Sequence, residues 1–461
     1  MTRSHRPALA LALACASACG APPSHHDPRA VLAGGSAVAS FLPSAATEAS
    51  AQPLRRPAAA QVADVPPPIP RQRAPDHVRG IYVTAYAAAS PRRMPQLLAL
   101  ADSTEINTFV VDVKDESGVL FESADPGVRA VRAGWKRPVG DLRKLADTLR
   151  AHDIWSVARI VVFKDPVLSK TRPAWSIRTA GGALWRDKAG NTWVSPWDER
   201  VWSYNLAVAE EAARAGFDEI QFDYVRFPEA YRSLPTQVHP RAPAGARKSD
   251  AIAAFLQRAS ERLRPLGVAV GADLFGLAMN DPGDVEIGQQ WETLSVRVDH
   301  LYPMVYPSHY FPTHLPGVRH PNRMPYETVA AAVGMGVVRN DRLRHAGGAP
   351  ARTIPWLQAF DAPWVDRHFP YGPQQARAQM DAVYAVGLED WVFWNAASRY
   401  DRVAGAFARE ADPRARPYRA PAPVLRQLAR FEGWGMRAAR AKAVAESPEK
   451  QTLRQGDEAL P

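Results

Sequence analysis

The chain has 461 residues, a formal net charge of +10 and 46% hydrophobic residues, which is enough for one large core with appended segments. Arginine carries much of the positive charge, but no dense basic run accompanies a nucleic-acid-binding motif, so we expect no nucleic-acid partner. The two cysteines, Cys15 and Cys19, lie at the extreme N-terminus, which excludes disulfides and cysteine-based metal sites from the rest of the chain.

The N-terminus has the pattern of an export signal. Arg3 and Arg6 precede an apolar run over 7–18 that is too short for a permanent membrane span. The sequence ASAC, which ends at Cys19, is similar to a bacterial lipoprotein cleavage box. We therefore predict lipidation at Cys19 and a membrane-anchored protein of the cell envelope. Cys15 is the competing acceptor, and an ordinary secretory signal, which would give a secreted or periplasmic protein, is the alternative.

A stretch rich in Ala, Pro and Ser follows the signal. Such a composition cannot bury enough apolar area to fold, so it predicts a flexible tether.

From residue 78 onward, short apolar runs alternate with helical patterns. The runs that predict strands are 79–86, 107–115, 154–163, 217–225, 267–275, 298–306, 352–360 and 390–397. Eight strands alternating with helices are typical of an α/β protein with a (β/α)8 TIM barrel. The rival is an open doubly wound sheet, which usually carries a Gly-rich phosphate loop after an early strand, and this sequence has none.

The predicted organisation has four parts. They are a signal peptide over 1–19, a disordered linker over 20–76, the barrel over 77–410, and a C-terminal helix with a polar tail over 411–461.

Polar and aromatic residues occur near the C-terminal ends of nearly all the predicted strands. Alternate residues of a barrel strand face the interior, and barrel active sites lie at the C-terminal ends of the strands. A purely structural barrel would place Val, Ile and Leu there, because an unpaired buried polar group costs ~1–3 kcal/mol. The residues predicted to bind substrate are Tyr82, Asp112, Lys114, Arg159, Gln221, Arg226, Tyr306, His309, Gln358 and Trp394.

The fourth strand, over 217–225, shows the alternation most clearly. Its apolar residues at 220, 222 and 224 share one face, and Gln221 and Asp223 share the other. We expect Gln221 and Asp223 to line a cleft, and Pro228 to end the strand at the rim of that cleft.

Two acids at the ends of neighbouring strands suggest a division of labour. Glycoside hydrolysis needs one ionised carboxylate and one carboxylic acid. Asp223 is close to Arg226 in sequence and is expected near Arg159 in space, so we predict it as the nucleophile or stabiliser. Asp273 is surrounded by apolar residues that would raise its pKa, so we predict it as the general acid/base. The structural alternatives are an ion pair between Asp223 and Arg226, and a turn-capping role for Asp273.

The segment GFDEIQFDYVRFP resembles the signature strand of a bacterial family of glycoside hydrolase-like proteins, which is catalogued as a domain of unknown function with a TIM-barrel fold. RGIYVTAYAAA, NTFVVDVKDESGVLFES, ARIVVFKDP, GADLFG and YPMVYPSHY resemble its other blocks in order. The resemblance implies a glycosidase-like barrel over about 78–400, with Asp223 at the position of a nucleophile after strand four. Related barrels place the second acid after strand five or six, and the sixth strand here ends without a carboxylate, which favours Asp273.

These observations predict a hydrolase that cleaves a polysaccharide or cell-wall glycan and needs no cofactor or metal. The alternative is a non-catalytic carbohydrate-binding barrel protein at the cell envelope. A metal-dependent deacetylase would need an Asp and a His pair at helical spacing. His309, His314 and His320 are spaced five and six apart in a Pro-rich loop, so this third class is disfavoured.

Overall fold

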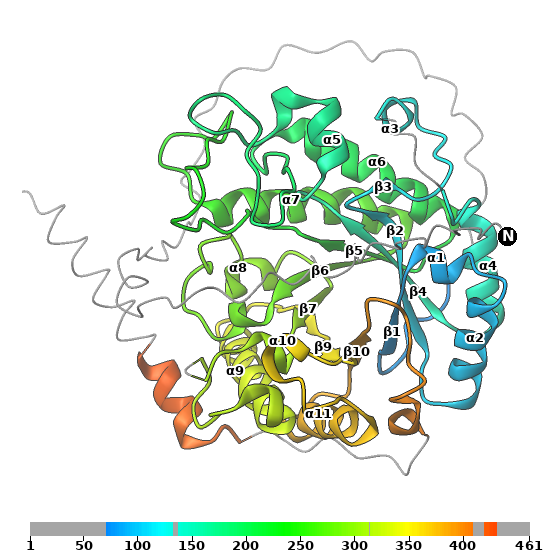
Figure 1. Ribbon diagram of the computed structural model, residues 1–461, viewed down its shortest axis with the longest axis vertical. Helices are drawn as coiled ribbons and strands as arrows, with labels where there is room; N and C mark the ends of the chain where they lie inside the picture. Colours follow the sequence, from blue (N-terminus) through cyan, green and yellow to red (C-terminus); the bar gives the residue numbers. More distant parts are fainter. Residues whose placement is uncertain (1–70, 132–136, 313, 409–418, 431–461) are drawn as a thin grey trace, which may run out of the picture. The chain divides into compact units, whose positions relative to one another are not determined.

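Eight parallel strand positions close into a barrel in the computed structural model, which describes residues 71–131, 137–312, 314–408 and 419–430 (Figure 1). The strands are β1 (Arg79–Val83), β2 (Thr108–Asp115), β4 (Trp155–Val161), β5 (Glu219–Asp223), β6 (Ala269–Phe275), β7 (His300–Met304), β8 with β9 (Arg352–Thr353 and Trp356–Gln358), and β10 (Trp391–Trp394). Each pairs in parallel with the next, and β1 pairs with both β2 and β10, so the parallel strands form a closed ring. The predicted barrel is confirmed and the open sheet is excluded.

Helices form the outer layer around the strands (Figure 1). The longer ones are α2 (Arg93–Ser103), α4 (Leu142–Ala151), α6 (Glu199–Ala215), α7 (Lys248–Leu263), α9 (Pro325–His345) and α11 (Pro373–Ala385). Shorter helices lie in the connections: α1 (Ala85–Ala88), α3 (Pro126–Arg129), α5 (Pro166–Thr171), α8 (Trp291–Ser295) and α10 (Pro363–Asp366). A short strand β3 (Gly118–Val119) folds back antiparallel on β2.

Local signals set the ends of several of these helices. Asp141 precedes α4, and its side chain accepts hydrogen bonds from the backbone N–H groups of Arg143 and Lys144. Asp198 precedes α6, and its side chain accepts one from the backbone N–H of Arg200. Gly216 follows α6 with φ 110°, a left-handed conformation that stops the helix at little steric cost.

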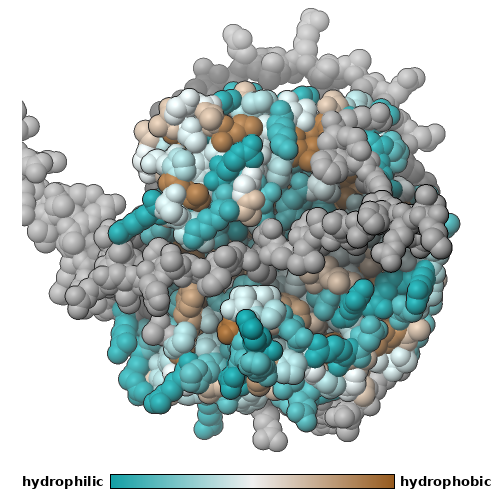
Figure 2. Space-filling view, viewed as in Figure 1, coloured by the Kyte–Doolittle hydropathy of each residue, from teal (hydrophilic) through white to brown (hydrophobic). Residues whose placement is uncertain are grey.

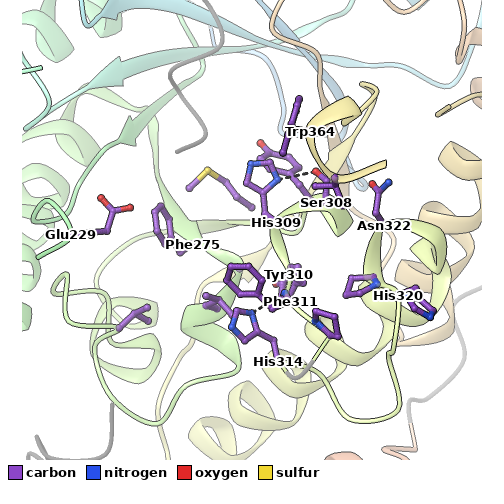
Figure 3. A pocket seen from close by; sticks show the side chains of 18 of the residues that line it. Glu229, Phe275, Ser308, His309, Tyr310, Phe311, His314, His320, Asn322 and Trp364 are labelled. Atoms are coloured by element: carbon purple, nitrogen blue, oxygen red, sulfur yellow. Dashed lines mark hydrogen bonds between the residues drawn. The ribbon is translucent and has the colours of Figure 1, made fainter. Parts of the chain in front are cut away.

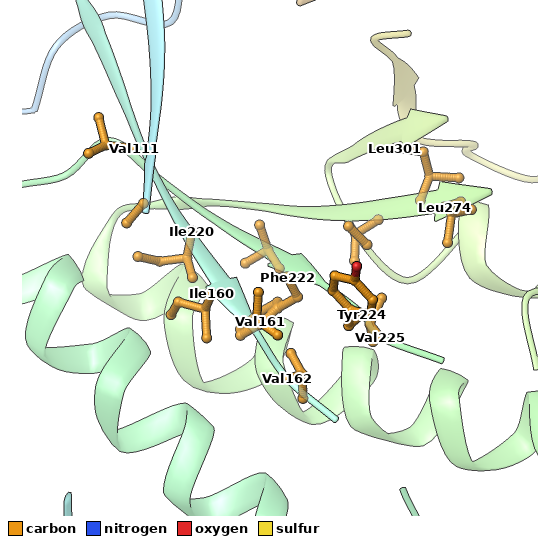
Figure 4. Close-up of a cluster of buried hydrophobic side chains, with 14 of the residues drawn as sticks. Val111, Ile160, Val161, Val162, Ile220, Phe222, Tyr224, Val225, Leu274 and Leu301 are labelled. Carbon is orange, nitrogen blue, oxygen red and sulfur yellow. The ribbon is translucent and has the colours of Figure 1, made fainter. Parts of the chain in front are cut away.

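The outward faces of the strands and the inner faces of the helices form the main core (Figure 4). Ile220 and Phe222 on β5 are fully buried there, and the Phe222 ring lies 5.2 Å from that of Phe255 on α7. Because strand residues alternate between faces, Gln221 and Asp223 then point into the barrel. The predicted alternation of this strand is thus confirmed.

The end of β5 differs from the prediction. The strand stops at Asp223, because Tyr224 has φ 49° and turns the chain away from the ladder. A left-handed conformation costs a non-glycine residue of order 1–3 kcal/mol. The backbone therefore turns immediately after Asp223, and not at Pro228.

The last residues of the predicted linker contact the barrel. The Arg71 guanidinium donates to the backbone oxygens of Ala213, Phe217 and Leu266 at 2.5–3.1 Å. Phe217 precedes β5, so this contact lies at the N-terminal end of the barrel, opposite the predicted site. Arg71, which lies in the predicted linker, is thus hydrogen-bonded to the barrel.

Other predictions concern residues outside the described ranges: the signal peptide with Cys19, the linker before residue 71, and most of the C-terminal tail. Within the C-terminal region, residues 422–430 are helical. None of the helices in the described ranges is both long and apolar enough to cross a membrane. Hydrophilic residues predominate over most of the described surface that Figure 2 shows.

Candidate active site

One arginine joins acidic side chains from three other barrel strands. Arg159, on β4, donates two hydrogen bonds to Oδ2 of Asp223, one from Nε at 3.0 Å and one from Nη2. Its Nη1 lies 2.5 Å from Oδ1 of Asp112 on β2, and its Nε lies 3.8 Å from Oδ2 of Asp273 on β6. All four residues are at most 5% exposed, so solvent screens these charges little. The fold thus brings both predicted catalytic carboxylates to one guanidinium.

Asp273 is the most deeply buried of these acids, at 1% exposure. Trp356 Nε1 donates to its Oδ1 at 2.7 Å, and its Oδ2 has no hydrogen-bond partner among the described residues. Burial, together with the negative charge of Asp223, raises the pKa of Asp273 well above its usual range, although Arg159 opposes the shift. A carboxyl group that stays protonated near neutral pH can donate a proton, as a general acid must.

A stacked aromatic pair, Tyr82 and Trp394, lies beside the Arg159 guanidinium. The Tyr82 hydroxyl donates to Oδ2 of Asp112, and its ring stacks on Trp394 with the centroids 3.9 Å apart. The Arg159 guanidinium lies 5.1 Å from the centre of the Trp394 ring, within cation–π range. Burial raises the pKa of Asp112 to about 6 against the opposing charge of Arg159. Tyr82, Asp112 and Trp394 therefore belong to the same group as the two catalytic candidates.

Arg226 lies beyond the end of β5 and has a different partner from Asp223. Its Nη1 is 3.1 Å from Oε2 of Glu229, and its guanidinium lies 4.5 Å from the centre of the Phe275 ring. Asp223 accepts from Arg159 and, through Oδ1, from the backbone N–H of Tyr224 at 2.5 Å. The alternative that Asp223 forms an ion pair with Arg226 is therefore wrong.

Lys114 does not join this group. The register of β2 against β4 shifts between Asp112 and Lys114, so Lys114 lies beside Ile160, whose side chain faces the helices. Its Nζ forms a fully buried ion pair with Asp165 at 2.8 Å and lies 5.8 Å from the centre of the Tyr204 ring on α6. The expected inward position was wrong, because the irregularity breaks the alternation that the sequence suggested.

The two predicted glutamines have different surroundings. Gln221 is fully buried on the inward face of β5, and neither of its side-chain amide atoms has a hydrogen-bond partner among the described residues. Gln358 accepts from the backbone N–H of Ser308 at 3.1 Å and donates to the carbonyl of Phe360 at 2.9 Å. Gln358 thus links the loops after β7 and β9, and its side-chain amide is hydrogen-bonded to backbone groups of these loops.

A cavity of about 600 Å³ lies among the loops that follow β5, β6, β7 and β9 (Figure 3). Tyr306 and His309, two of the predicted substrate-binding residues, line it together with Arg226. Burial lowers the pKa of His309 to about 4, and its Nδ1 lies 3.0 Å from the Ser308 hydroxyl. Neither Asp223 nor Asp273 is among the lining residues. Most of the predicted site residues therefore belong to one of two groups, the cluster around Arg159 and the lining of this cavity. Lys114, Gln221 and Gln358 belong to neither.

Sequence analysis missed a further buried acid, Glu219 at the start of β5. Its carboxylate accepts from Trp155 Nε1 at 3.1 Å and from the Tyr302 hydroxyl at 2.9 Å, and it lies 2.9 Å from His300 Nδ1. Glu219 is two and four residues before Gln221 and Asp223, so the alternation of the strand could have predicted that its side chain also points inward. Glu219 lies at the start of β5, and its carboxylate is held by side chains of Trp155, His300 and Tyr302, so we assign it a structural role.

No group of three or more His, Cys, Asp or Glu side chains is arranged to hold a metal ion within the described ranges. Trp356 on β9, which was not among the predicted site residues, is the hydrogen-bond donor to Asp273.

A search of curated proteins found no match. A hypothetical protein of known structure from Ruminiclostridium thermocellum ATCC 27405 is 37% identical, and the match covers 42% of this chain and 97% of that chain, with a TM-score of 0.38. The glycoside hydrolase domain of PgaB (BpsB) from Bordetella bronchiseptica is 17% identical, with 73% of this chain and 100% of that chain covered and a TM-score of 0.51, a likeness of fold. Residues 80–400 match the family described as "Putative glycosyl hydrolase domain", and the chain belongs to that family.

Proposed function

We propose that this protein is a glycoside hydrolase that cleaves a polysaccharide or cell-wall glycan with Asp223 and Asp273. The observation that carries the proposal is the contrast between two carboxyl groups beside one arginine. Asp223 is the ion-pair partner of Arg159, whereas Asp273 is desolvated and has a raised pKa. Glycoside hydrolysis needs this contrast, with one anionic carboxylate and one protonated acid.

In the proposed reaction, Asp223 attacks or stabilises the anomeric carbon while Asp273 protonates the departing oxygen. Arg159 orients Asp223 through two hydrogen bonds, and Trp356 orients Asp273 through one. Asp273 is only 1% exposed, so it can act as the acid only if the side chains that cover it move when substrate binds. Family membership and the barrel fold support the class of reaction, and the assignment of roles is our own.

The test is release of reducing ends from a panel of polysaccharides and peptidoglycan by the full chain. Asp223→Asn and Asp273→Asn are measured in parallel, with Asp299→Asn as the matched control. Asp299 pairs with Arg264 at 2.9 Å and accepts from the backbone of Val270 at the start of β6, the opposite end of the barrel.

We expect release by the parent and by Asp299→Asn, and loss of release in Asp223→Asn. The alkaline limb of the pH–rate profile should move in Asp273→Asn, because that limb reports loss of the acid proton. Equal release by the parent and Asp223→Asn would place the site elsewhere. Glycan binding without release by the parent would favour a carbohydrate-binding protein.

Export and a lipid anchor at Cys19 also stay a proposal. Labelling of cells with a palmitate analogue should mark the protein, and label that survives Cys19→Ala would defeat the assignment.

A further inference from the structure

The cavity beside the carboxylate cluster has an aromatic wall that reaches the surface. Tyr306 and Trp364 line the cavity, and the ring of Phe360, which does not line it, contacts both, with its centroid 5.6 Å from that of Tyr306 and 6.3 Å from that of Trp364. Tyr306 belongs to the apolar cluster inside the barrel, whereas Trp364 is 52% exposed. A large indole left half exposed at the mouth of a cavity is an unusual use of apolar surface and points to a ligand.

The cavity lies directly above the layer of the catalytic candidates. Phe275 and Met304 end β6 and β7, are paired in register, and line the cavity. Asp273 and Tyr302 are the paired residues two positions earlier. Residues two apart on a strand share a face, so the Phe275–Met304 pair stands over the Asp273–Tyr302 pair. A molecule in the cavity would therefore be next to the proposed reaction centre without occupying it.

The charged side chains of the cavity neutralise one another. Arg226 pairs with Glu229 at 3.1 Å, and Arg323 pairs with Asp366 at 2.5 Å, and all four residues line the cavity. These are two cations and two anions, so no formal charge is left to attract an acidic or a basic ligand. Burial also lowers the pKa values of His309 and His314, which leaves both imidazoles neutral near pH 7.

The size and chemistry of the cavity define the ligand class. Its volume of about 600 Å³ lies within the ~300–1,000 Å³ typical of small-molecule sites. Exposed aromatic faces at Trp364 and Phe311, the latter 37% exposed, suit the apolar faces of sugar rings, and neutral imidazoles can exchange hydrogen bonds with hydroxyl groups (Figure 3).

We propose that this cavity is a subsite for the uncharged sugar units next to the cleaved bond, with Trp364 as the platform on which a sugar ring stacks. The inference rests on the proposed glycosidase function and narrows its substrate to a neutral glycan long enough to reach from the Arg159 cluster to Trp364.

Binding tests the subsite independently of turnover. Isothermal titration calorimetry would be run on the full chain carrying Asp223→Asn, with neutral hexasaccharides and disaccharides of β-1,4-linked glucose, xylose and N-acetylglucosamine. Charged hexasaccharides, oligogalacturonate and fully de-N-acetylated chitohexaose, form the contrasting arm. Trp364→Ala is added to this background, and Tyr86→Ala is the matched control, because Tyr86 is 54% exposed and does not line the cavity.

We expect at least one neutral hexasaccharide to bind more tightly than its disaccharide and than both charged hexasaccharides. Trp364→Ala should weaken that binding about 10-fold or more, which corresponds to about 1.4 kcal/mol, and Tyr86→Ala should change it less than about 2-fold. Tighter binding of a charged oligosaccharide, no binding of any neutral one, or binding unaffected by Trp364→Ala would each overturn the subsite.

The two proposals can fail separately. If Trp364→Ala weakens binding of a neutral hexasaccharide but the parent shows no hydrolysis, the subsite proposal is supported and the glycosidase proposal is refuted. If hydrolysis depends on Asp223 but Trp364→Ala does not change binding, the glycosidase proposal is supported and the subsite proposal is refuted.

Discussion

Arg159→Met tests whether the carboxylate cluster depends on one buried cation. The substitution removes the guanidinium that pairs with Asp112 and Asp223, which are 3% and 5% exposed. The same guanidinium lies 3.8 Å from Asp273. Removal of one member of a buried ion pair typically costs 3–5 kcal/mol, because the remaining charge stays desolvated. We therefore expect the free energy of unfolding near pH 7 to fall by about 3–5 kcal/mol, measured by urea denaturation with tryptophan fluorescence.

The loss should shrink as the pH falls. In the variant, the unpaired buried carboxyl groups would bind protons more tightly in the folded than in the unfolded state, so acid stabilises the folded state relative to pH 7. Adding Asp112→Asn to Arg159→Met should recover part of the loss near pH 7, because one uncompensated charge is removed. Arg344→Met is the matched surface control. Arg344 pairs with Asp341, both about half exposed, and its loss should cost less than about 1 kcal/mol. A loss below about 1 kcal/mol for Arg159→Met, or a loss that is the same near pH 5, would refute the reasoning.

Three further outcomes follow from the same geometry. Because the pKa of Asp273 is raised, the folded state favours its protonated form, and this contribution to stability is lost as pH rises from the unfolded towards the folded pKa. Asp273→Asn should therefore gain stability relative to the parent as pH rises above about 4, and parallel pH curves from urea denaturation would contradict this. Gly271→Ala should lower the free energy of unfolding by about 1–3 kcal/mol, because its Cβ would lie 2.5 Å from Oε1 of Glu219 and 2.8 Å from Cε2 of Tyr302; an unchanged urea midpoint would argue against this crowding. His309→Gln should leave the pH–rate profile unshifted above about pH 5, since the pKa of His309 is about 4; a moved limb in that range would show that His309 titrates in the reaction.

Local periodicity determined much of the barrel in advance. The alternation in the strand that contains Asp223 assigned its apolar residues to the helix layer and Gln221 with Asp223 to the interior, and the structure has both faces in those places. Such a pattern is readable because the side-chain period of a strand is set by backbone geometry and needs no knowledge of its neighbours. The same reasoning located Asp112, Arg159 and Asp273 on inward faces.

Pairing, register and exposure were decided by the tertiary structure. The irregularity in β2 sent Lys114 to the helix layer, and Tyr224 turned the chain before Pro228 could. Arg159 became the partner of Asp223, from which it is separated by 64 residues, and the nearby Arg226 did not. Trp364, which was not among the predicted site residues, became half exposed beside a cavity. Each of these outcomes depends on which strands and loops become neighbours when the barrel closes, and on the register in which they pair. The pattern of residues along the sequence contains no information about either.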